Sequence, residues 1–414
     1  MNRKILTIVI LIVLISFSTC QAGISYTEGK QSYFTKEEIS KTKNPLLNLK
    51  LNLLMKLSKL PSLSACIIKD DEVVWSNGFG FYDLENKKKA TDNTIYLICS
   101  ITKSITATAL LQLYDQGLFD LDDDVNNYLS FSLRNPNHPD DPITFRMLLA
   151  HQSSINSNVY CNATGQYYIG DYEIPSYPYP WLMDYLTPNG SLYSPEVWTG
   201  DKPGEKMHYS GIGYCLCGYL IELISGQKYK DYCKDHIFEP LQMYNTSFNL
   251  SDLNLDNVAI HYTINNSGLI TTYDSHEHFT LLPYPGGGLR SSVSDLSHFL
   301  IAHMNNGVYK GLRLLNESTV NEMHKVQYYN DEVNYRYGTD FQYGFGWLIR
   351  NRPFIKDLSG HTGAYELGAR TKMLYRPSKN TGIIYFTNTL PKGRQFYIWE
   401  YVIEKVLFRY AEKL

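Results

Sequence analysis

The chain has 414 residues, of which 43% are hydrophobic and 19% charged, with a formal net charge of −3. A chain of this length can bury a sizeable core and can form two subdomains. The small net charge gives no indication of binding to nucleic acid or to an anionic membrane surface. The 35 tyrosines are typical of an aromatic-lined cleft, although a compositional bias explains them more simply.

The N-terminus has the pattern of a secretory signal peptide. A basic start at residues 2–4 precedes a largely apolar run at residues 5–17. Small residues at positions 18–22 then offer a cleavage site after Ala22. The run is shorter than the about 20 apolar residues that a membrane span needs, so an anchor is the weaker interpretation. We therefore expect residues 1–22 to be removed, residues 23–44 to form a loosely held arm, and the protein to be secreted or to enter an endomembrane lumen.

Cysteines and glycosylation sequons bear on the same question. Six cysteines would remain after cleavage, and in an oxidising compartment some of them should pair, although the sequence does not say which. Cys215 and Cys217 lie in an apolar helical stretch, where buried thiols are favoured over a metal site. Asn-x-Ser/Thr sequons are typical of secreted glycoproteins, although several arise by chance in a chain rich in asparagine. They begin at Asn162, Asn189, Asn245, Asn249, Asn265 and Asn316.

The first part of the chain predicts a helix followed by a β-hairpin. From Pro45 onward, leucines recur in two rows at helical spacing, which predicts a helix with one broad buried face. Residues 63–68 and 73–76 flank a polar turn and predict a hairpin. The same sheet is expected to continue through residues 78–82.

The middle of the chain is expected to contain helices and long loops. Residues 143–151 and 214–225 predict helices. Between them, residues 160–200 are rich in Pro, Tyr and Gly, which is typical of a loop that borders an active site. Residues 249–280 are expected to be irregular. The glycines at 286–288 are not followed by Lys and Ser/Thr, so they indicate a tight turn rather than a phosphate loop.

The C-terminal part predicts a helix and then several strands. Ser292 is a good N-cap for a helix that ends near Gly307. Strands are predicted at 343–349, 364–375 and 381–386, followed by a closing amphipathic helix. Because strands lie near both ends with helices between them, we expect an α+β fold. Its antiparallel sheet would be built from the N- and C-terminal segments and flanked by helices, with an inserted, mainly helical subdomain.

Ser100 is the candidate nucleophile. It begins a long apolar-periodic helix, and Lys103 lies three residues later on the same helical face. A serine hydroxyl is a weak nucleophile at neutral pH and needs a neighbour that takes its proton, which a lysine of lowered pKa can do. The Ser-x-x-Lys pattern also occurs at Ser40 and Ser225, but neither of these begins such a helix.

Two further short motifs offer partners for such a site. Tyr209, in the run His-Tyr-Ser-Gly before a predicted helix, can act as a base when an ammonium group stabilises its phenolate. The run Gly-His-Thr-Gly-Ala at residues 360–364 enters a predicted strand. It offers a titratable ring, a hydroxyl and a backbone N–H group with little side-chain obstruction.

Together these motifs resemble those of a known family. Ser100 with Lys103, Tyr209, and the run His361-Thr362-Gly363, in this order, are similar to the three motifs of serine beta-lactamase-related proteins. The closest branch is the group of class C beta-lactamases, D-alanyl-D-alanine carboxypeptidases and esterases, which are penicillin-binding-protein-like. Connecting segments are similar too, and they lie at residues 148–154, 285–292 and 343–347.

The resemblance implies a domain organisation and an activity. A beta-lactamase-related domain would cover residues 45–412, with an α/β part at about 45–100 and 285–412 and a helical part at about 101–284. The activity would be that of a secreted serine hydrolase, which acts through an acyl-enzyme on an ester or amide of a small molecule or peptide. No cofactor, metal, nucleic acid or further membrane contact is implied, and the oligomeric state stays open.

The resemblance also implies roles for the motif residues. Ser100 would be acylated, and Lys103 and Tyr209 would share the work of the general base. The backbone N–H groups of Ser100 and Ala364 would form an oxyanion hole, in which each donor contributes about a hundredfold to a thousandfold in rate.

Two departures from the family pattern bear on the substrate. His361 stands where a lysine is usual and, with a reference pKa of about 6.5, is a weaker cation at neutral pH. Gly211 stands where the family has an asparagine that helps to hold a substrate amide. Thr362 and Gly363 complete the substrate-facing edge. We therefore expect uncharged short esters to be preferred, and activity on carboxylated substrates to rise toward mildly acidic pH.

Other interpretations of the same residues differ in function. A protein that kept the fold and binds without efficient turnover would explain the missing asparagine. A metal-dependent hydrolase using His276, Glu277 and His278 is disfavoured, because no Asp-His follows and the stretch lies in a polar loop. His151, in a connecting segment, is expected to be structural. Arg370 is expected either near the cleft or on the solvated surface.

Overall fold

The computed structural model describes residues 44–157, 167–169, 180–267, 270–281, 283–327, 342–352, 355–391 and 394–414. They belong to one compact unit. The expected signal peptide and arm, Cys161, the sequon at Asn162 and part of the predicted loop at 160–200 lie outside the described residues. Those expectations stay predictions.

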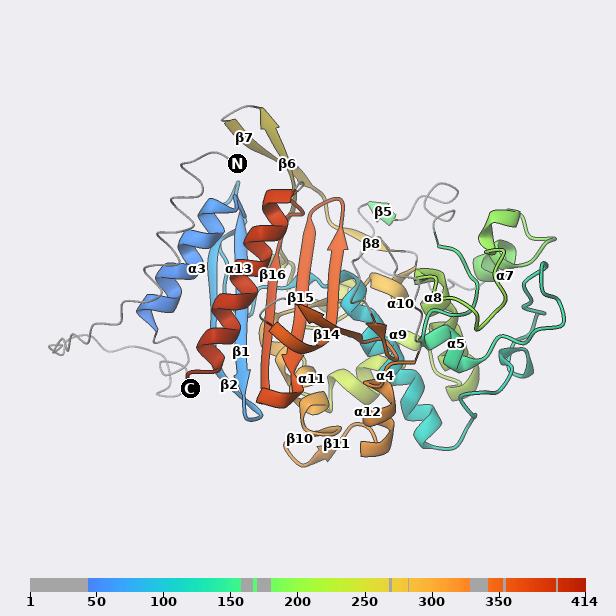
Figure 1. The fold of residues 1–414 in the computed structure, drawn as a ribbon. Helices are drawn as coiled ribbons and strands as arrows, with labels where there is room; N and C mark the ends of the chain where they lie inside the picture. Colours follow the sequence, from blue (N-terminus) through green and yellow to red (C-terminus); the bar gives the residue numbers. More distant parts are fainter. Residues whose placement is uncertain are drawn as a thin grey trace, which may run out of the picture. The chain divides into compact units, whose positions relative to one another are not determined.

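An antiparallel sheet of eight strands forms the centre of the described residues, and both ends of the chain contribute to it (Figure 1). Its order is β12-β13-β14-β15-β16-β1-β2-β3. The strands are β12 (Gln342–Tyr343), β13 (Leu348–Arg352), β14 (Ile355–Tyr365), β15 (Ala369–Arg376), β16 (Thr381–Thr387), β1 (Ser62–Lys69), β2 (Glu72–Asp83) and β3 (Lys88–Lys89). The pairing of β1 with β16 joins the two ends of the chain, so the predicted α+β fold is confirmed.

Two turns in this sheet follow from backbone chemistry. Between β1 and β2, Asp70 and Asp71 have φ of 49° and 65°, the left-handed pair that a two-residue hairpin favours, so the predicted hairpin is confirmed. The single strand predicted at 364–375 is wrong, because the chain turns at Gly368, whose φ is 115°. The run His-Thr-Gly therefore lies near the end of β14 and not at the start of a strand.

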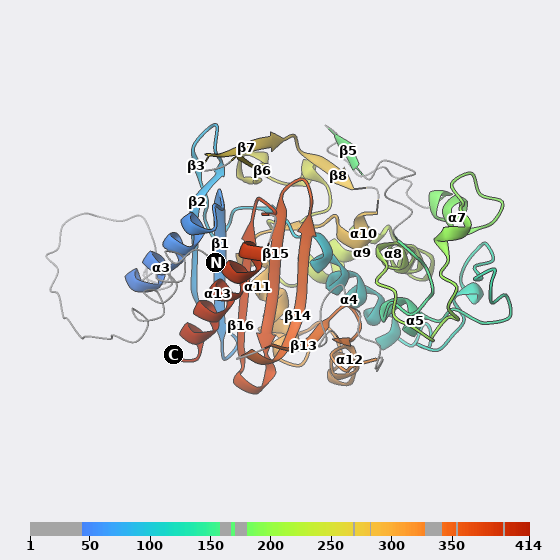
Figure 2. The ribbon, with the colours of Figure 1, turned by 45° about the horizontal axis from the view of Figure 1, so that its top comes forward.

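Two helices cover one face of the sheet. α3 (Pro45–Leu57) and α13 (Arg394–Ala411) lie side by side on it (Figures 1 and 2). One leucine row of α3 is buried in the core that the two helices share with the sheet, namely Leu47, Leu51 and Leu54. Three leucines of the other row are exposed, namely Leu46, Leu49 and Leu53, whereas Leu57 is partly buried and Leu60, just after the helix, is buried in the same core. The buried face of the helix is therefore narrower than predicted, because an outer helix packs through one stripe.

The opposite face carries the helices that position the candidate site. α11 (Val293–Met304) packs against β1 and β16, and the predicted N-cap is confirmed, because Ser292 Oγ accepts from the Asp295 N–H at 3.0 Å. α4 (Thr102–Asp115), the helix after Ser100, is buried along most of its length. It packs against α8 (Gly211–Ser225) and the single turn α10 (Tyr284–Gly287). Of the shorter helices, α9 (Tyr229–Cys233) packs against α4 and α5 (Phe145–Leu149) packs against α8. The remaining two are α7 (Pro180–Leu186) and α12 (Glu317–Met323).

The stretch at 249–280 was expected to be irregular, and this is wrong. It contains a hairpin of β6 (His261–Ser267) and β7 (Ile270–His276), visible at one end of the sheet in Figure 1. β8 (Phe279–Leu281) follows and pairs with β5 (Tyr167–Ile169). Threonine and tyrosine suit strands without being apolar, so this hairpin gives no clear alternation of apolar and polar residues.

The described cysteines form no disulfide. Five of them are buried and unpaired, namely Cys66, Cys99, Cys215, Cys217 and Cys233. The expected pairing is therefore absent among these five, whereas the expectation of buried thiols at positions 215 and 217 is confirmed.

The described sequons differ in accessibility. Asn189, Asn265 and Asn316 are exposed, but Asn249 is only 6% exposed, so its side chain is out of reach of a glycan in the folded chain. Within the described ranges, no helix has both the length and the apolar character that crossing a membrane requires.

Candidate active site

Ser100 lies in a tight turn at the start of α4. This turn is a single 3-10 turn (Cys99–Ile101). Cys99, the residue before Ser100, has φ of 51°, a left-handed conformation that is costly for a residue with a side chain. Two bonds hold this turn: Thr102 Oγ1 donates to the Cys99 carbonyl at 2.6 Å, and the Ile98 N–H donates to the Leu289 carbonyl at 2.9 Å. Ser100 itself is half-buried, so its hydroxyl can be reached from solvent while its backbone is fixed.

Lys103 is buried one turn behind the serine. Its side chain is 2% exposed, and Nζ donates to Ser100 Oγ at 3.3 Å and to the Gly286 carbonyl at 2.5 Å. No carboxylate of the described residues forms an ion pair with it. Nζ instead lies 5.0 Å from the ring centroid of Tyr209 and 5.8 Å from that of Tyr214. Burial lowers the pKa of Lys103 to about 8, so a fraction of the amine is free at neutral pH.

Tyr209 closes this arrangement from the loop before α8. Ser210, the next residue, caps the helix by accepting from the Gly213 N–H at 3.0 Å. Burial raises the pKa of Tyr209, and a hydrogen bond with Ser100 acts in the opposite direction. Because the pKa is raised overall, the phenol is neutral at rest, and the free amine of Lys103 is the stronger candidate for the base.

The end of β14 packs directly on the turn of Ser100. A Cβ added to Gly363 would lie 2.3 Å from the Ile98 carbonyl oxygen and 2.8 Å from Cys99 Cβ, so only glycine fits there. Thr371 Oγ1, on the neighbouring strand, donates to the same Ile98 carbonyl at 2.8 Å. These contacts fix the edge that carries half-buried Thr362 and exposed Ala364 beside the candidate nucleophile.

The sequence that forms this site matches a known protein family. A beta-lactamase family model matches residues 52–407. The chain belongs to the beta-lactamase family. The predicted resemblance is thereby confirmed.

Relatives within the family are distant. The chain is 28% identical to protein flp of Staphylococcus aureus (strain MW2) over 336 residues, or 80% of this chain and 60% of that protein. It thus spans about 60% of the length of this curated relative. The structure of an octameric penicillin-binding protein homologue from Pyrococcus abyssi is 28% identical, with a TM-score of 0.67, and 87% of this chain and 77% of that chain are covered.

A second solved structure shares the fold alone. The D-amino acid amidase from Ochrobactrum anthropi SV3 is 21% identical, has a TM-score of 0.68, and the match covers 88% of this chain and 99% of the amidase chain.

His361 does not act as a cation at this family site. The side chain is 1% exposed, and burial, with the nearby charge of Lys103, lowers its pKa to about 3. Nδ1 lies 2.9 Å from both the backbone nitrogen and the carbonyl oxygen of Thr362, and Nε2 lies 2.8 Å from the Tyr343 hydroxyl, so both ring nitrogens are engaged within the protein. The expectation that His361 gains charge in mild acid and then holds a carboxylate is therefore wrong.

Sequence reasoning missed a chain of tyrosines behind His361. The Tyr343 hydroxyl is hydrogen-bonded both to His361 Nε2, at 2.8 Å, and to Tyr214, whose own hydroxyl donates to the Leu149 carbonyl at 2.7 Å. The only signal for Tyr343 was its place in the connecting segment at 343–347, which by itself says nothing about a contact with His361.

Gly211, the second departure from the family pattern, leaves space at the first residue of α8. A Cβ added there would have Ser157 Oγ, at 3.9 Å, as its nearest contact. Ser157 Oγ accepts from the Ile212 N–H at 3.2 Å and lies 3.0 Å from Ser210 Oγ. A small hydroxyl therefore lies near the place where relatives carry an amide side chain.

The other sequence candidates lie elsewhere or have different partners. Ser225 Oγ donates to the Ile221 carbonyl at 2.6 Å and Lys228 pairs with Glu222 at 3.6 Å, so this second Ser-x-x-Lys is structural. Ser40 lies outside the described residues. His276 Nε2 bonds Thr263 Oγ1 at 3.1 Å. Across the described ranges, no three metal-ligating side chains lie close enough to share an ion.

Arg370 lies beside the third motif and not on the solvated surface, because its Nη1 donates to the Gly363 carbonyl at 3.5 Å. It pairs with Glu400 of α13, with Nη2 3.0 Å from Oε2. Lys372, which is fully buried, lies 3.0 Å from Glu404 and 3.2 Å from Glu400. Burial raises the pKa of Glu400, but Lys372 and Arg370 outweigh it and lower the pKa below its usual range. These four charges fasten α13 to β15.

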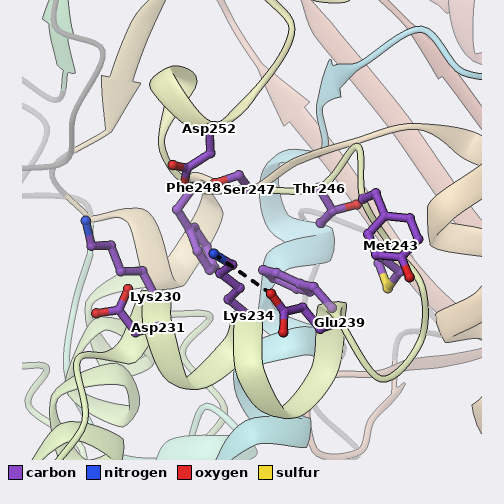
Figure 3. A pocket seen from close by; sticks show the side chains of 11 residues that line it. Lys230, Asp231, Lys234, Glu239, Met243, Thr246, Ser247, Phe248 and Asp252 are labelled. Carbon is purple, nitrogen blue, oxygen red and sulfur yellow. Dashed lines mark hydrogen bonds and ion pairs between the residues drawn. The ribbon is translucent and has the colours of Figure 1, made fainter.

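A hollow of about 250 Å³ lies beside α9, apart from the candidate site (Figure 3). Its walls include Phe248 and Met243, and its rim carries Lys234 and Glu239, whose charged groups lie 3.9 Å apart. None of the predicted site residues lines it. We assign it no role in the reaction.

Proposed function

We propose that the protein is a serine hydrolase that acts on an ester or amide through an acyl-enzyme. The observation that carries the proposal is the buried Lys103, whose Nζ lies 3.3 Å from Ser100 Oγ and has a pKa lowered to about 8. A lysine of that pKa, with a serine in hydrogen-bond reach and a tyrosine bonded to the same serine, is the arrangement that activates a hydroxyl.

The reaction would proceed in two balanced steps. Ser100 Oγ forms a bond to the carbonyl carbon, its proton passes to the pair of Lys103 and Tyr209, and the pair returns a proton to the departing alcohol or amine as its bond to carbon breaks. Water then attacks the ester of Ser100 in the same way, giving the acid and the free serine. The free amine of Lys103 is the final acceptor of this proton, which reaches it directly or through the Tyr209 hydroxyl that is hydrogen-bonded to Ser100.

The edge of β14 would stabilise the oxyanion. Gly363 brings the backbone of this edge against the turn of Ser100, which supports the backbone N–H groups of Ser100 and Ala364 as donors. Each such donor contributes about a hundredfold to a thousandfold in rate.

Neutral substrates should be preferred over carboxylated ones. His361 is uncharged and its two ring nitrogens are engaged by Thr362 and Tyr343, so it offers no cation. Gly211 offers no amide. Short uncharged esters need neither group, whereas D-alanyl peptides and penicillins carry a carboxylate that would be held less well.

A substrate panel tests the proposal. Purified protein is assayed with a p-nitrophenyl ester, a D-amino acid amide and a chromogenic beta-lactam, together with Ser100→Ala and the matched control Ser225→Ala. We expect ester hydrolysis that Ser100→Ala abolishes and Ser225→Ala leaves unchanged. Binding of these compounds without turnover by the unmodified protein would overturn the proposal in favour of a binding protein of the same fold.

We also propose that the protein is secreted, as its N-terminal sequence indicates. Sequencing the N-terminus of protein from a secreting host should give Gly23 as the first residue. An intact Met1 on intracellular protein would contradict this.

A further inference from the structure

His151 lies next to Tyr209 in an unusual conformation. It follows α5, is 1% exposed, and has φ of 61°, a left-handed value that few residues with a side chain adopt. Its ring centroid lies 4.3 Å from that of Tyr209 and 4.6 Å from that of Tyr343. A residue held in a costly backbone conformation beside a reacting group is a candidate for a positioning role.

Two hydrogen bonds connect His151 to the residues on either side of Tyr209. The His208 N–H donates to the main-chain carbonyl of His151 at 2.7 Å, and the Ser210 N–H donates to His151 Nδ1 at 3.0 Å. One residue thus fixes both backbone amides that flank Tyr209. The left-handed backbone of His151 presents its carbonyl and its ring to the same short loop.

The second bond requires a neutral ring. Because Nδ1 accepts from Ser210, the ring proton is on Nε2, and a second proton on Nδ1 would place two donors against each other. Burial lowers the pKa of His151 well below 6.5, with Lys103 of α4 and His361 of β14 acting in the same direction. Nε2 has no hydrogen-bond partner among the described residues, so Nδ1 is the ring atom that makes the specific contact.

We propose that His151 is a positioning residue for Tyr209: its carbonyl and its Nδ1 hold the loop so that the Tyr209 hydroxyl stays in hydrogen-bond reach of Ser100. This rests on the proposed function, and it assigns to His151 a task beyond the structural one. A displacement of about 1 Å in such a group can lower a rate by about a hundredfold. Removal of the acceptor on residue 151 should therefore reduce kcat for acylation and leave KM nearly unchanged.

A matched pair of variants isolates the acceptor. His151→Asn keeps an oxygen at the position of Nδ1 and tolerates the left-handed backbone, whereas His151→Gly tolerates the backbone without any acceptor. For ester hydrolysis we expect His151→Gly to lower kcat about 30-fold to 100-fold and His151→Asn to lower it less than about fivefold, each with KM within about threefold. Equal losses in the two variants would overturn the proposal.

The same substitutions in a Tyr209→Phe background separate positioning from folding. If His151 acts through Tyr209, His151→Gly should cost less than about threefold more once the Tyr209 hydroxyl is gone. A loss as large as in the unmodified protein would mean that His151 acts elsewhere, and would overturn the proposal.

A third measurement does not depend on activity. Hydrogen exchange of the Ser210 amide should be slow in the unmodified protein and in His151→Asn, and at least about tenfold faster in His151→Gly, while the amides of β16 keep their protection. Should the unmodified protein hydrolyse nothing, the proposed function fails, and the exchange result still decides whether His151 holds the loop. Equal exchange of Ser210 in all three proteins would refute the inference whatever the activity.

Discussion

The pKa of Lys103 gives a quantitative prediction for the rate of acylation. With a pKa of about 8, about a tenth of the amine is free at pH 7 and about nine tenths at pH 9. If the free amine accepts the serine proton, acylation should be about ten times faster at pH 9 than at pH 7, with its midpoint near pH 8. A lysine with an ordinary pKa of about 10.4 would still be mostly charged at pH 9, and the rate would keep rising beyond it.

The assay uses an uncharged fluorophosphonate, which reacts once with an activated serine and carries no titrating group of its own. Second-order labelling rates are measured from pH 6 to pH 10 for the unmodified protein, for Lys103→Met and for the surface variant Lys69→Met, with probe hydrolysis subtracted. Lys69→Met should reproduce the unmodified profile, and Lys103→Met should be slow at every pH. A profile that is flat between pH 7 and pH 9, or that falls, would refute the assignment of Lys103 as the base.

Three further predictions concern the space beside Gly211, the buried histidines and the buried ion pair of Lys372. In Gly211→Asn the new Cβ meets no atom closer than 3.9 Å, so the variant should fold normally. The added side-chain amide should contribute one hydrogen bond to the substrate, worth about 1.4 kcal/mol, and raise the rate of labelling by a fluorescent penicillin about tenfold; an unchanged rate would contradict this. Burial lowers the pKa of His261, His324 and His361 to about 3, so the unfolded chain binds protons that the folded chain does not, and stability is lost as pH falls below 6.5. Each ring contributes about 1.4 kcal/mol between pH 7.5 and pH 5.5, and His151 and His303 act in the same direction, so the free energies of unfolding in urea at these two pH values should differ by at least about 4 kcal/mol; equal values would contradict this. Glu404→Gln removes one of the two carboxylates that compensate the buried charge of Lys372, and should lower the free energy of unfolding in urea by about 2 to 4 kcal/mol. An unchanged free energy of unfolding would contradict the burial of this pair.

Features that depend on short stretches of sequence were predicted correctly. The turn of β1 and β2, the N-cap at Ser292 and the helix that begins after Ser100 follow from turn residues, capping residues and apolar spacing. Each of these signals acts within one or two helical turns or one hairpin. The order of the motifs and their family resemblance supplied the fold.

Features that depend on packing were predicted poorly. The leucine rows of α3 look equivalent in sequence, but only contact with the sheet decides which row is buried. The β6–β7 hairpin has no apolar alternation and was expected to be irregular. In both cases the deciding partner lies far away in the sequence.

The charge state of His361 is the most consequential example at the site. A reference pKa of about 6.5 predicts a weak cation, but the ring is buried and bonded to Tyr343. No pattern near position 361 announces that partner. The sequence predicts that mild acid strengthens the binding of a carboxylate by charging His361. With His361 buried and neutral, we expect mild acid to lower the stability of the fold instead.

The most direct test of the central claim is to locate the covalent adduct. The unmodified protein is treated with a fluorophosphonate at pH 9, digested, and its labelled peptide is mapped by tandem mass spectrometry. We predict one modified residue, Ser100, with stoichiometry near one per folded chain and no adduct in Ser100→Ala. An adduct on another serine, or none in protein that is folded and pure, would contradict the assignment of Ser100 as the nucleophile.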